Sequence, residues 1–255
     1  MTGISYTPDQ AITCFKIIID PANSNRLYVL ANNIVYRSLD GGTSFDNIYT
    51  LVNQTCWNCQ RNLRDIKMKP GDPNTLYITA DCSGAGGGSV ILRTTNATAI
   101  SPISPTWTPI ATGYDFSNVQ RIGLAVSPKD PNCLFAAYQD TPQYNAGDML
   151  VAGKTYKVIN NNIIYNGATY FIGNTINVLP GNTTFTSADI TKPGKVTINI
   201  FYILKSTSSG ASWIQYLSKT GIIDSYGEKF AGLGFWRLEL EVSPTDLDVI
   251  YVGGV

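Results

Sequence analysis

The chain has 255 residues, with 18 Lys and Arg against 18 Asp and Glu, no His, 44% hydrophobic residues and 14% charged residues. This composition argues against a disordered chain and against a basic nucleic-acid surface, and the absence of His removes His-based proton shuttles, nucleophile pairs and metal sites. Abundant Tyr and Gly favour strands and turns over helices, so we expect an all-β protein without a membrane span.

The N-terminal segment reads MTGISYTPDQAITCF and lacks the basic start and the apolar stretch of a secretory signal peptide. The composition is nevertheless typical of an extracellular protein. Three explanations fit: a mature fragment without its leader, an unusual secretion route, or a virion protein that lysis releases.

One segment is repeated four times along the chain, and the four copies align with one another without a gap. The copies cover residues 15–31, 66–80, 122–138 and 238–254. Each has an apolar run that ends in a proline, an Asx residue two and another four positions later, and an aliphatic-aromatic pair at positions six and seven. The prolines are Pro21, Pro70, Pro128 and Pro244, and the pairs are Leu27-Tyr28, Leu76-Tyr77, Leu134-Phe135 and Ile250-Tyr251.

This pattern predicts a hairpin. Proline ends the pairing of the first strand, Asx side chains accept hydrogen bonds from backbone amides in the turn, and the apolar pair begins the returning strand. We therefore expect Leu27, Leu76, Leu134 and Ile250 to occupy equivalent buried positions in four successive units.

After the first copy comes YRSLDGGTSFD, which has the Asp-box spacing Ser-x-Asp-x-Gly-x-Ser-aromatic. A degenerate version, KSTSSGASWI, follows the third copy with Ser208 in place of the Asp, and the second copy keeps only LRTTNAT and a later Trp107. The residues in register are Ser38, Asp40, Gly42, Ser44 and Phe45 in the first version and Ser206, Gly210, Ser212 and Trp213 in the degenerate one.

With the proline hairpins, these motifs make the chain resemble the Asp-box (BNR-repeat) β-propellers of the sortilin and xyloglucanase-like type. The resemblance covers most of the chain outside residues 139–200 and implies a fold more than an activity, because the Asp of the box stabilises a turn and its aromatic residue packs between strands. It implies four-stranded blades, three and a half of them in this chain, with the propeller formed by residues 1–138 and 201–255.

The half blade at 237–242 and 249–253 has no third or fourth strand in the sequence. Two explanations remain open: a longer chain completes the ring, or a neighbouring subunit supplies the missing strands, because an open blade presents an unsatisfied edge.

The insert, residues 139–200, alternates apolar and polar residues with turn signals at residues 160–162 and at Asn166-Gly167, which predicts a small β-meander. It resembles small modules in phage structural proteins and bacterial surface proteins, although an elaborated loop without a partner is the alternative. Its candidate contact residues are Tyr156, Tyr165, Tyr170 and Phe171, whose other role would be to pack the core of the insert itself.

Four of the five cysteines fall toward one predicted face of the blades. They are Cys14, Cys56, Cys59 and Cys82. The spacing of Cys56 and Cys59 fits one zinc knuckle, but the second pair is split, so disulfide bonds, a zinc site and free thiols all stay open.

A catalytic pair of carboxylates is not recognisable. In the xyloglucanase-like family a catalytic Asp follows a blade's second strand; the first blade has Asn32 and Asn33 there, and the second has Asp81 with no partner that can be named. We therefore assign no catalytic residue, metal or cofactor. The function expected is a non-enzymatic structural or binding protein, extracellular on a virion or a cell, whose partners are other protein subunits and a surface glycan. The alternative is a secreted glycoside hydrolase of the same fold.

Overall fold

The computed structural model describes residues 14–31, 33–51, 60–83, 88–100, 104–111, 114, 116, 119, 121–140, 142–198, 200–220 and 238–254. Within these ranges the regular structure consists of strands, so the prediction of an all-β protein is confirmed. No helix in the described ranges is long and apolar enough to cross a membrane. The chain divides into two compact units, the first made of Met1–Gln139, Tyr202–Leu217 and Gly232–Val255, the second of Asp140–Phe201 and Ser218–Ala231.

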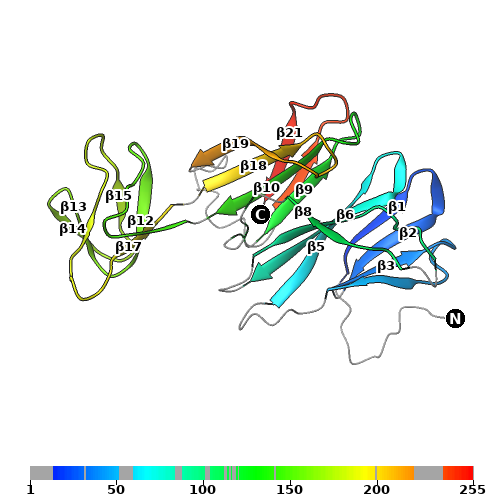
Figure 1. The fold of residues 1–255 in the computed structure, drawn as a ribbon, viewed down its shortest axis with the longest axis horizontal. Helices are drawn as coiled ribbons and strands as arrows, with labels where there is room; N and C mark the ends of the chain where they lie inside the picture. Colours follow the sequence, from blue (N-terminus) through cyan, green and yellow to red (C-terminus); the bar gives the residue numbers. More distant parts are fainter. Residues whose placement is uncertain are drawn as a thin grey trace. The chain divides into compact units, whose positions relative to one another are not determined.

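In the first unit the described strands form three four-stranded antiparallel sheets and one two-stranded ladder (Figure 1). The first sheet contains β1 (Cys14–Asp20), β2 (Asn23–Ala31), β3 (Ile34–Ser38) and β4 (Asp46–Thr50). The second contains β5 (Gln60–Lys69), β6 (Asp72–Ser83), β7 (Val90–Thr94) and β8 (Thr108–Ile110). The third contains β9 (Ile122–Val126), β10 (Leu134–Asp140), β18 (Ile200–Ser206) and β19 (Ile214–Thr220), and the ladder contains β20 (Leu238–Val242) and β21 (Ile250–Gly254).

The four repeat hairpins share one register. In each, the residue two before the repeat proline pairs with the residue six after it: Ile19 with Leu27, Met68 with Leu76, Val126 with Leu134 and Val242 with Ile250. The four copies are thus equivalent in backbone pairing, as the spacing predicts.

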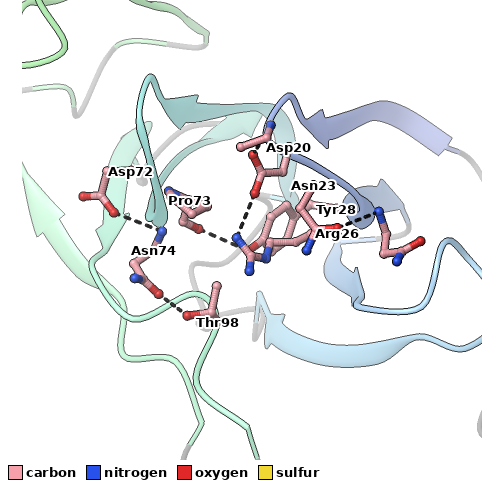
Figure 2. A network of polar contacts seen from close by, with 10 residues as sticks. Asp20, Asn23, Arg26, Tyr28, Asp72, Pro73, Asn74 and Thr98 are labelled. Carbon is pink, nitrogen blue, oxygen red and sulfur yellow. Dashed lines mark hydrogen bonds and ion pairs between the residues drawn. The ribbon is translucent and has the colours of Figure 1, made fainter.

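The Asx side chains stabilise these turns as expected. The amide of Asn74 donates to Asp72 at 3.1 Å (Figure 2), and the same bond recurs in the other three copies at 3.0–3.1 Å.

The aliphatic residues at the shared position differ in burial. Leu76 and Leu134 are fully buried, whereas Leu27 and Ile250 are half-buried. The prediction of four equally buried residues is therefore correct for the two inner copies only. Leu27 and Ile250 belong to the first and last sheets of the unit, each of which has one neighbouring sheet in the described part of the chain.

Two hydrophobic cores lie between successive sheets. One joins residues of the first and second sheets, including Tyr28 and Ile66, and the other joins the second and third sheets, including Tyr77 and Leu124. The first strands of the sheets lie next to one another in the order β1, β5, β9, β20.

The second unit has two small sheets around its own core. Its strands are β11 (Gln143–Asn145), β12 (Thr155–Asn160), β13 (Ile163–Tyr165), β14 (Ala168–Tyr170), β15 (Thr175–Asn177), β16 (Thr186–Ser187) and β17 (Lys195–Thr197). One sheet has the order β11-β17-β12-β15 and the other β14-β13-β16.

The prediction of a simple meander in this unit is wrong. β13 and β14 form the hairpin expected at Asn166-Gly167, but β12 pairs with β15 and β17 and not with β13. The chain crosses from one sheet to the other at Asn161, whose φ is 51°. Apolar side chains of both sheets, such as Val158 and Ile163, then face the common core.

Candidate functional site

Asp81 is the one position at which the resemblance allows a catalytic carboxylate, and it is the centre of the candidate site. It lies in β6 opposite Asn62 of β5, and its side chain is buried, with 4% of the residue exposed. The pairing of β5 with β6 shifts register between Leu63 and Asp65, which leaves Arg64 as an extra residue. Such a bulge changes the direction of a side chain.

Two arginines hold one oxygen of this carboxylate. Arg64 Nε lies 3.0 Å and Arg121 Nε 3.1 Å from Asp81 Oδ2. Arg121 comes directly before β9, so the site joins the second and third sheets. The guanidinium of Arg64 also lies over the ring of Phe15, 5.1 Å from its centroid.

The second oxygen, Oδ1, is buried and has no hydrogen-bond partner among the residues that the structure describes. Burial raises the pKa of Asp81 to about 6, although Arg121 and Arg64 both oppose that shift. The carboxyl group is therefore close to half ionised in mildly acidic solution, and an unpartnered buried oxygen is unfavourable unless it carries the proton or a water molecule binds it.

Asn33 lies between β2 and β3 of the first sheet, near the end of the second strand, where Asp81 lies in the second sheet. Its φ is 64°, its Oδ1 accepts a hydrogen bond from the amide of Leu63 at 3.0 Å, and its Nδ2 donates to Asn62 Oδ1 at 3.3 Å. Asn33 thus links the first sheet to the second, while Asn32 lies outside the described residues.

The first Asp-box segment forms a tight turn around Asp40. The hydroxyl of Ser38 donates to Asp40 Oδ1 at 2.8 Å, and the amide and hydroxyl of Ser44 donate to Asp40 at 2.9 and 2.6 Å. The Gly42 amide donates to Ser38 Oγ at 2.8 Å, and its φ of 92° suits glycine. The hydrogen bonds from Ser44 and Ser38 lower the pKa of Asp40 to about 2, and Phe45 follows as a half-buried residue.

The degenerate segment forms the same turn with a hydroxyl in place of the carboxylate. The Gly210 amide donates to Ser206 Oγ at 2.9 Å, and the Ser212 amide donates to Ser208 Oγ at 2.9 Å. Trp213 is buried, and its indole donates to the Gly210 carbonyl oxygen at 3.0 Å.

A third turn of this kind lies where the second copy keeps only LRTTNAT and a later Trp107, a remnant that did not by itself predict the turn. Thr94 donates to Asn96 Oδ1 at 2.9 Å, and the amide of Thr106 donates to the same oxygen at 2.9 Å. Trp107 follows and lies 5.3 Å from the ring of Tyr49. The amide donor and the side-chain acceptor are ten positions apart in this turn (Thr106 and Asn96) and four apart in the first turn (Ser44 and Asp40), so the Asp-box spacing does not match here. The sequence feature that could have predicted the turn is Thr-x-Asn followed later by Thr-Trp.

The cysteine cluster stays a prediction. Cys14 is an exposed free thiol at the start of β1, and Cys133 is a buried free thiol before β10. Cys56, Cys59 and the side chain of Cys82 lie outside the described residues. Among the residues that are described, no group of three or more His, Cys, Asp or Glu side chains could hold a metal ion.

The candidate contact residues of the second unit do not form one surface. Tyr156 and Tyr165 are buried in the core of the unit, where their hydroxyls accept hydrogen bonds from the amides of Val151 and Leu179 at 3.0 and 2.7 Å. Tyr170 is half-buried against the same core, and Phe171 is exposed. The prediction of a contact role is therefore wrong for Tyr156 and Tyr165, because these side chains pack the small core, and only Phe171 is well exposed.

Comparison with known proteins gives matches among solved structures. No protein-family model matches the chain, and no curated protein matches it. Among solved structures, an ancestral GH74 enzyme superposes with a TM-score of 0.42 and 15% sequence identity over 91% of this chain. The chain spans 28% of the length of that enzyme.

Proposed function

We propose that the first unit is part of an Asp-box β-propeller and that the protein acts as a non-enzymatic structural or binding protein on the surface of a virion or a cell. Three sheets with the same strand order, four hairpins in one register and three turns of one hydrogen-bond pattern support the blade architecture. The sequence contains three and a half such blades.

The proposal that the protein is not an enzyme rests on the contacts of Asp81. Glycoside hydrolysis uses two carboxyl groups on opposite sides of the scissile bond. Both charged side chains that contact Asp81 in the described part of the chain are arginines, Arg64 and Arg121. A carboxylate clamped in this way joins two sheets, which supports a structural role for Asp81.

The second unit supports a role in contact with other subunits or a surface glycan. It exposes several large apolar side chains, although it has a core of its own. They are Met149, Val151, Phe171, Ile172, Leu179 and Ile190. The proposal requires that they gather into a contiguous patch, because such patches, and not scattered apolar side chains, mark interaction surfaces.

Release of reducing ends from a panel of soluble polysaccharides, together with binding to an immobilised glycan panel, tests this proposal. We expect no sugar release from the wild-type protein and none from Asp81→Asn. Sugar release that Asp81→Asn abolishes and the exposed control Asp46→Asn keeps would overturn the non-enzymatic assignment.

One observation favours the alternative, a secreted glycoside hydrolase. A buried carboxyl with a pKa of about 6 and an unpartnered oxygen has the protonation behaviour of a general acid. The same assay decides between the two functions, since hydrolysis by this group would fall as the pH rises above about 6.

A further inference from the structure

Lys16 and Asp65 form an ion pair between the first strands of the first and second sheets. Lys16 lies in β1 and Asp65 in β5, and each is the fifth residue before the proline of its repeat. Lys16 Nζ is 2.5 Å from Asp65 Oδ1. The fold therefore holds an amine directly against a carboxyl group, although the two residues are 49 positions apart in the sequence.

This pair combines an amine with a buried carboxyl group, which other ion pairs of the chain do not. Four other pairs use arginine, whose guanidinium stays charged and is not a nucleophile. Two further lysine pairs have largely exposed carboxyl groups, with side chains exposed to 64% at Glu241 and 80% at Asp248. The Asp65 side chain is 11% exposed and that of Lys16 is 26% exposed.

The surroundings of Asp65 favour its uncharged form. Burial raises the pKa of Asp65 and is the largest influence on it; Lys67 and Lys16 oppose that shift, and the negative charge of Glu239 adds to it. Transfer of one proton from the Lys16 ammonium to the Asp65 carboxylate converts the ion pair into a neutral amine and a carboxylic acid. The loss of two charges from a buried site offsets part of the cost of this transfer. The neutral amine is the form that is nucleophilic.

We propose that Lys16 and Asp65 join in an amide bond that links β1 covalently to β5. The lone pair of Lys16 Nζ attacks Asp65 Cγ and forms the new C–N bond. The nitrogen then passes one proton to the hydroxyl group of the tetrahedral intermediate, the C–O bond breaks, and this group leaves as water. The reaction releases one water molecule, transfers no electron and needs no co-reactant.

A backbone amide is placed to assist the attack. The amide of Ile66 donates a hydrogen bond of 2.8 Å to Asp65 Oδ1, the oxygen that also lies next to Lys16 Nζ. Negative charge develops on the carbonyl oxygen when Cγ is attacked, and a fixed donor at this oxygen stabilises that charge. Oδ1 is thus the oxygen that stays in the amide, and Oδ2 is the one that leaves.

The fold also supplies the proximity that the condensation lacks in free solution. Separate lysine and aspartate side chains are charged and hydrated in water and meet only by diffusion. Reacting groups that a structure holds together behave as if their concentration were about 10⁵–10⁸ M. The bond would therefore form after folding, and it would close a loop between residues 16 and 65 that holds the first two sheets together. This inference goes beyond the proposed function and holds whether or not the protein is an enzyme.

The intact mass of the full chain tests the proposal. We expect the wild type to be lighter than its sequence requires by the mass of one water molecule. Lys16→Arg keeps the positive charge beside Asp65 but cannot form the amide, so it should have its full calculated mass. Lys205→Arg, at a lysine whose partner Asp248 is largely exposed, is the matched control and should show the same mass deficit as the wild type.

Peptide mapping locates the bond. Trypsin does not cleave after a lysine whose amine is acylated, so the cross-link should join residues 1–26 to residues 65–67 in one branched peptide. We expect this peptide from the wild type and not from Lys16→Arg. A wild type of full mass that yields a linear peptide ending at Lys16 would overturn the proposal. A mass deficit that Lys16→Arg retains would also overturn it, because the water would then be lost elsewhere in the chain.

Discussion

Arg37 of the first sheet donates a hydrogen bond of 2.7 Å to the carbonyl oxygen of Ala97, which belongs to the second sheet's β7–β8 connection. The same Nη1 donates to the Ala99 carbonyl oxygen at 2.6 Å, and Nη2 donates to Asp46 at 3.1 Å. In the next sheet Arg93 has the equivalent position, directly before the turn, and donates to the carbonyl oxygen of Ser209 at 2.9 Å. A basic residue before the turn therefore links each of these sheets to the one that follows.

Arg37→Ala should lower the free energy of unfolding by about 1.5–3 kcal/mol, because two carbonyl oxygens lose a charged donor in a buried site. Lys157→Ala, at an exposed lysine of β12, is the control, and its effect should stay within about 0.5 kcal/mol. Urea unfolding of both variants measures the difference, and equal losses would contradict a linking role specific to Arg37.

The shared hairpin position gives a second matched pair. Leu76→Ala should cost about 2–5 kcal/mol, since the side chain is fully buried and its removal leaves a cavity. Leu27→Ala, at the same register position but half-buried, should cost clearly less. Thermal and urea unfolding give both values, and a larger loss for Leu27→Ala would show that the outer sheet is packed more tightly than its exposure indicates.

The parts of this fold that follow from the sequence are local. Each hairpin is specified within about ten residues by a proline, two Asx residues and an aliphatic-aromatic pair, so Pro70 and Leu76 predict one turn without any knowledge of the rest. The remnant LRTTNAT did not predict the turn around Asn96, because a longer loop separates the two halves of this turn.

The parts that do not follow depend on contacts between distant segments. Asp81 could be singled out, but its clamp depends on a bulge at Arg64 and on Arg121 from the next sheet, which no spacing rule links. Alternation of apolar residues also predicts strands without saying which side faces a core. For that reason the alternation predicts Tyr156 and Tyr165 as contact residues although they are buried.

The pKa of Asp40, about 2 in the folded protein, predicts a stability term that depends on pH. Because the folded pKa lies below the ordinary value, the stabilisation is present above pH about 4 and disappears as the pH falls toward about 2. Asp40→Ser reproduces the chemistry of the turn at Ser208 and should remove this term. Urea unfolding between those pH values, with Ser208→Asp as the reciprocal variant that should add such a term, checks the prediction; an unchanged pH profile in Asp40→Ser would contradict it.

Asp81 predicts a pH dependence of the opposite sign. Its folded pKa of about 6 lies above the ordinary value, so the folded state holds the proton more tightly between pH about 4 and about 6, and the free energy of unfolding falls as the pH rises through that range. Asp81→Asn cannot ionise, so its stability relative to the wild type should rise over the same interval. The carboxyl ¹³C chemical shift of Asp81 reports its titration directly, and a midpoint below about 4 would show that the arginines outweigh burial.

Gly123 predicts how closely β9 and β20 pack. A Cβ at this position would lie 3.1 Å from Leu238 Cγ and 3.2 Å from the Leu238 carbonyl oxygen, and the backbone oxygen cannot turn away as a side chain can. Gly123→Ala should therefore destabilise the protein by about 1–3 kcal/mol through overpacking. Gly253→Ala is the control. Its Cβ would meet only the Glu239 side chain at 3.8 Å, which is an ordinary contact, so its effect should stay within about 0.5 kcal/mol.

The double variant Gly123→Ala with Leu238→Val separates the two contacts of the new Cβ. It should regain the part of the lost stability that comes from the Leu238 side chain and keep the part that comes from the Leu238 carbonyl oxygen. Full stability of Gly123→Ala in urea unfolding would show that β20 can move away from β9 at no cost.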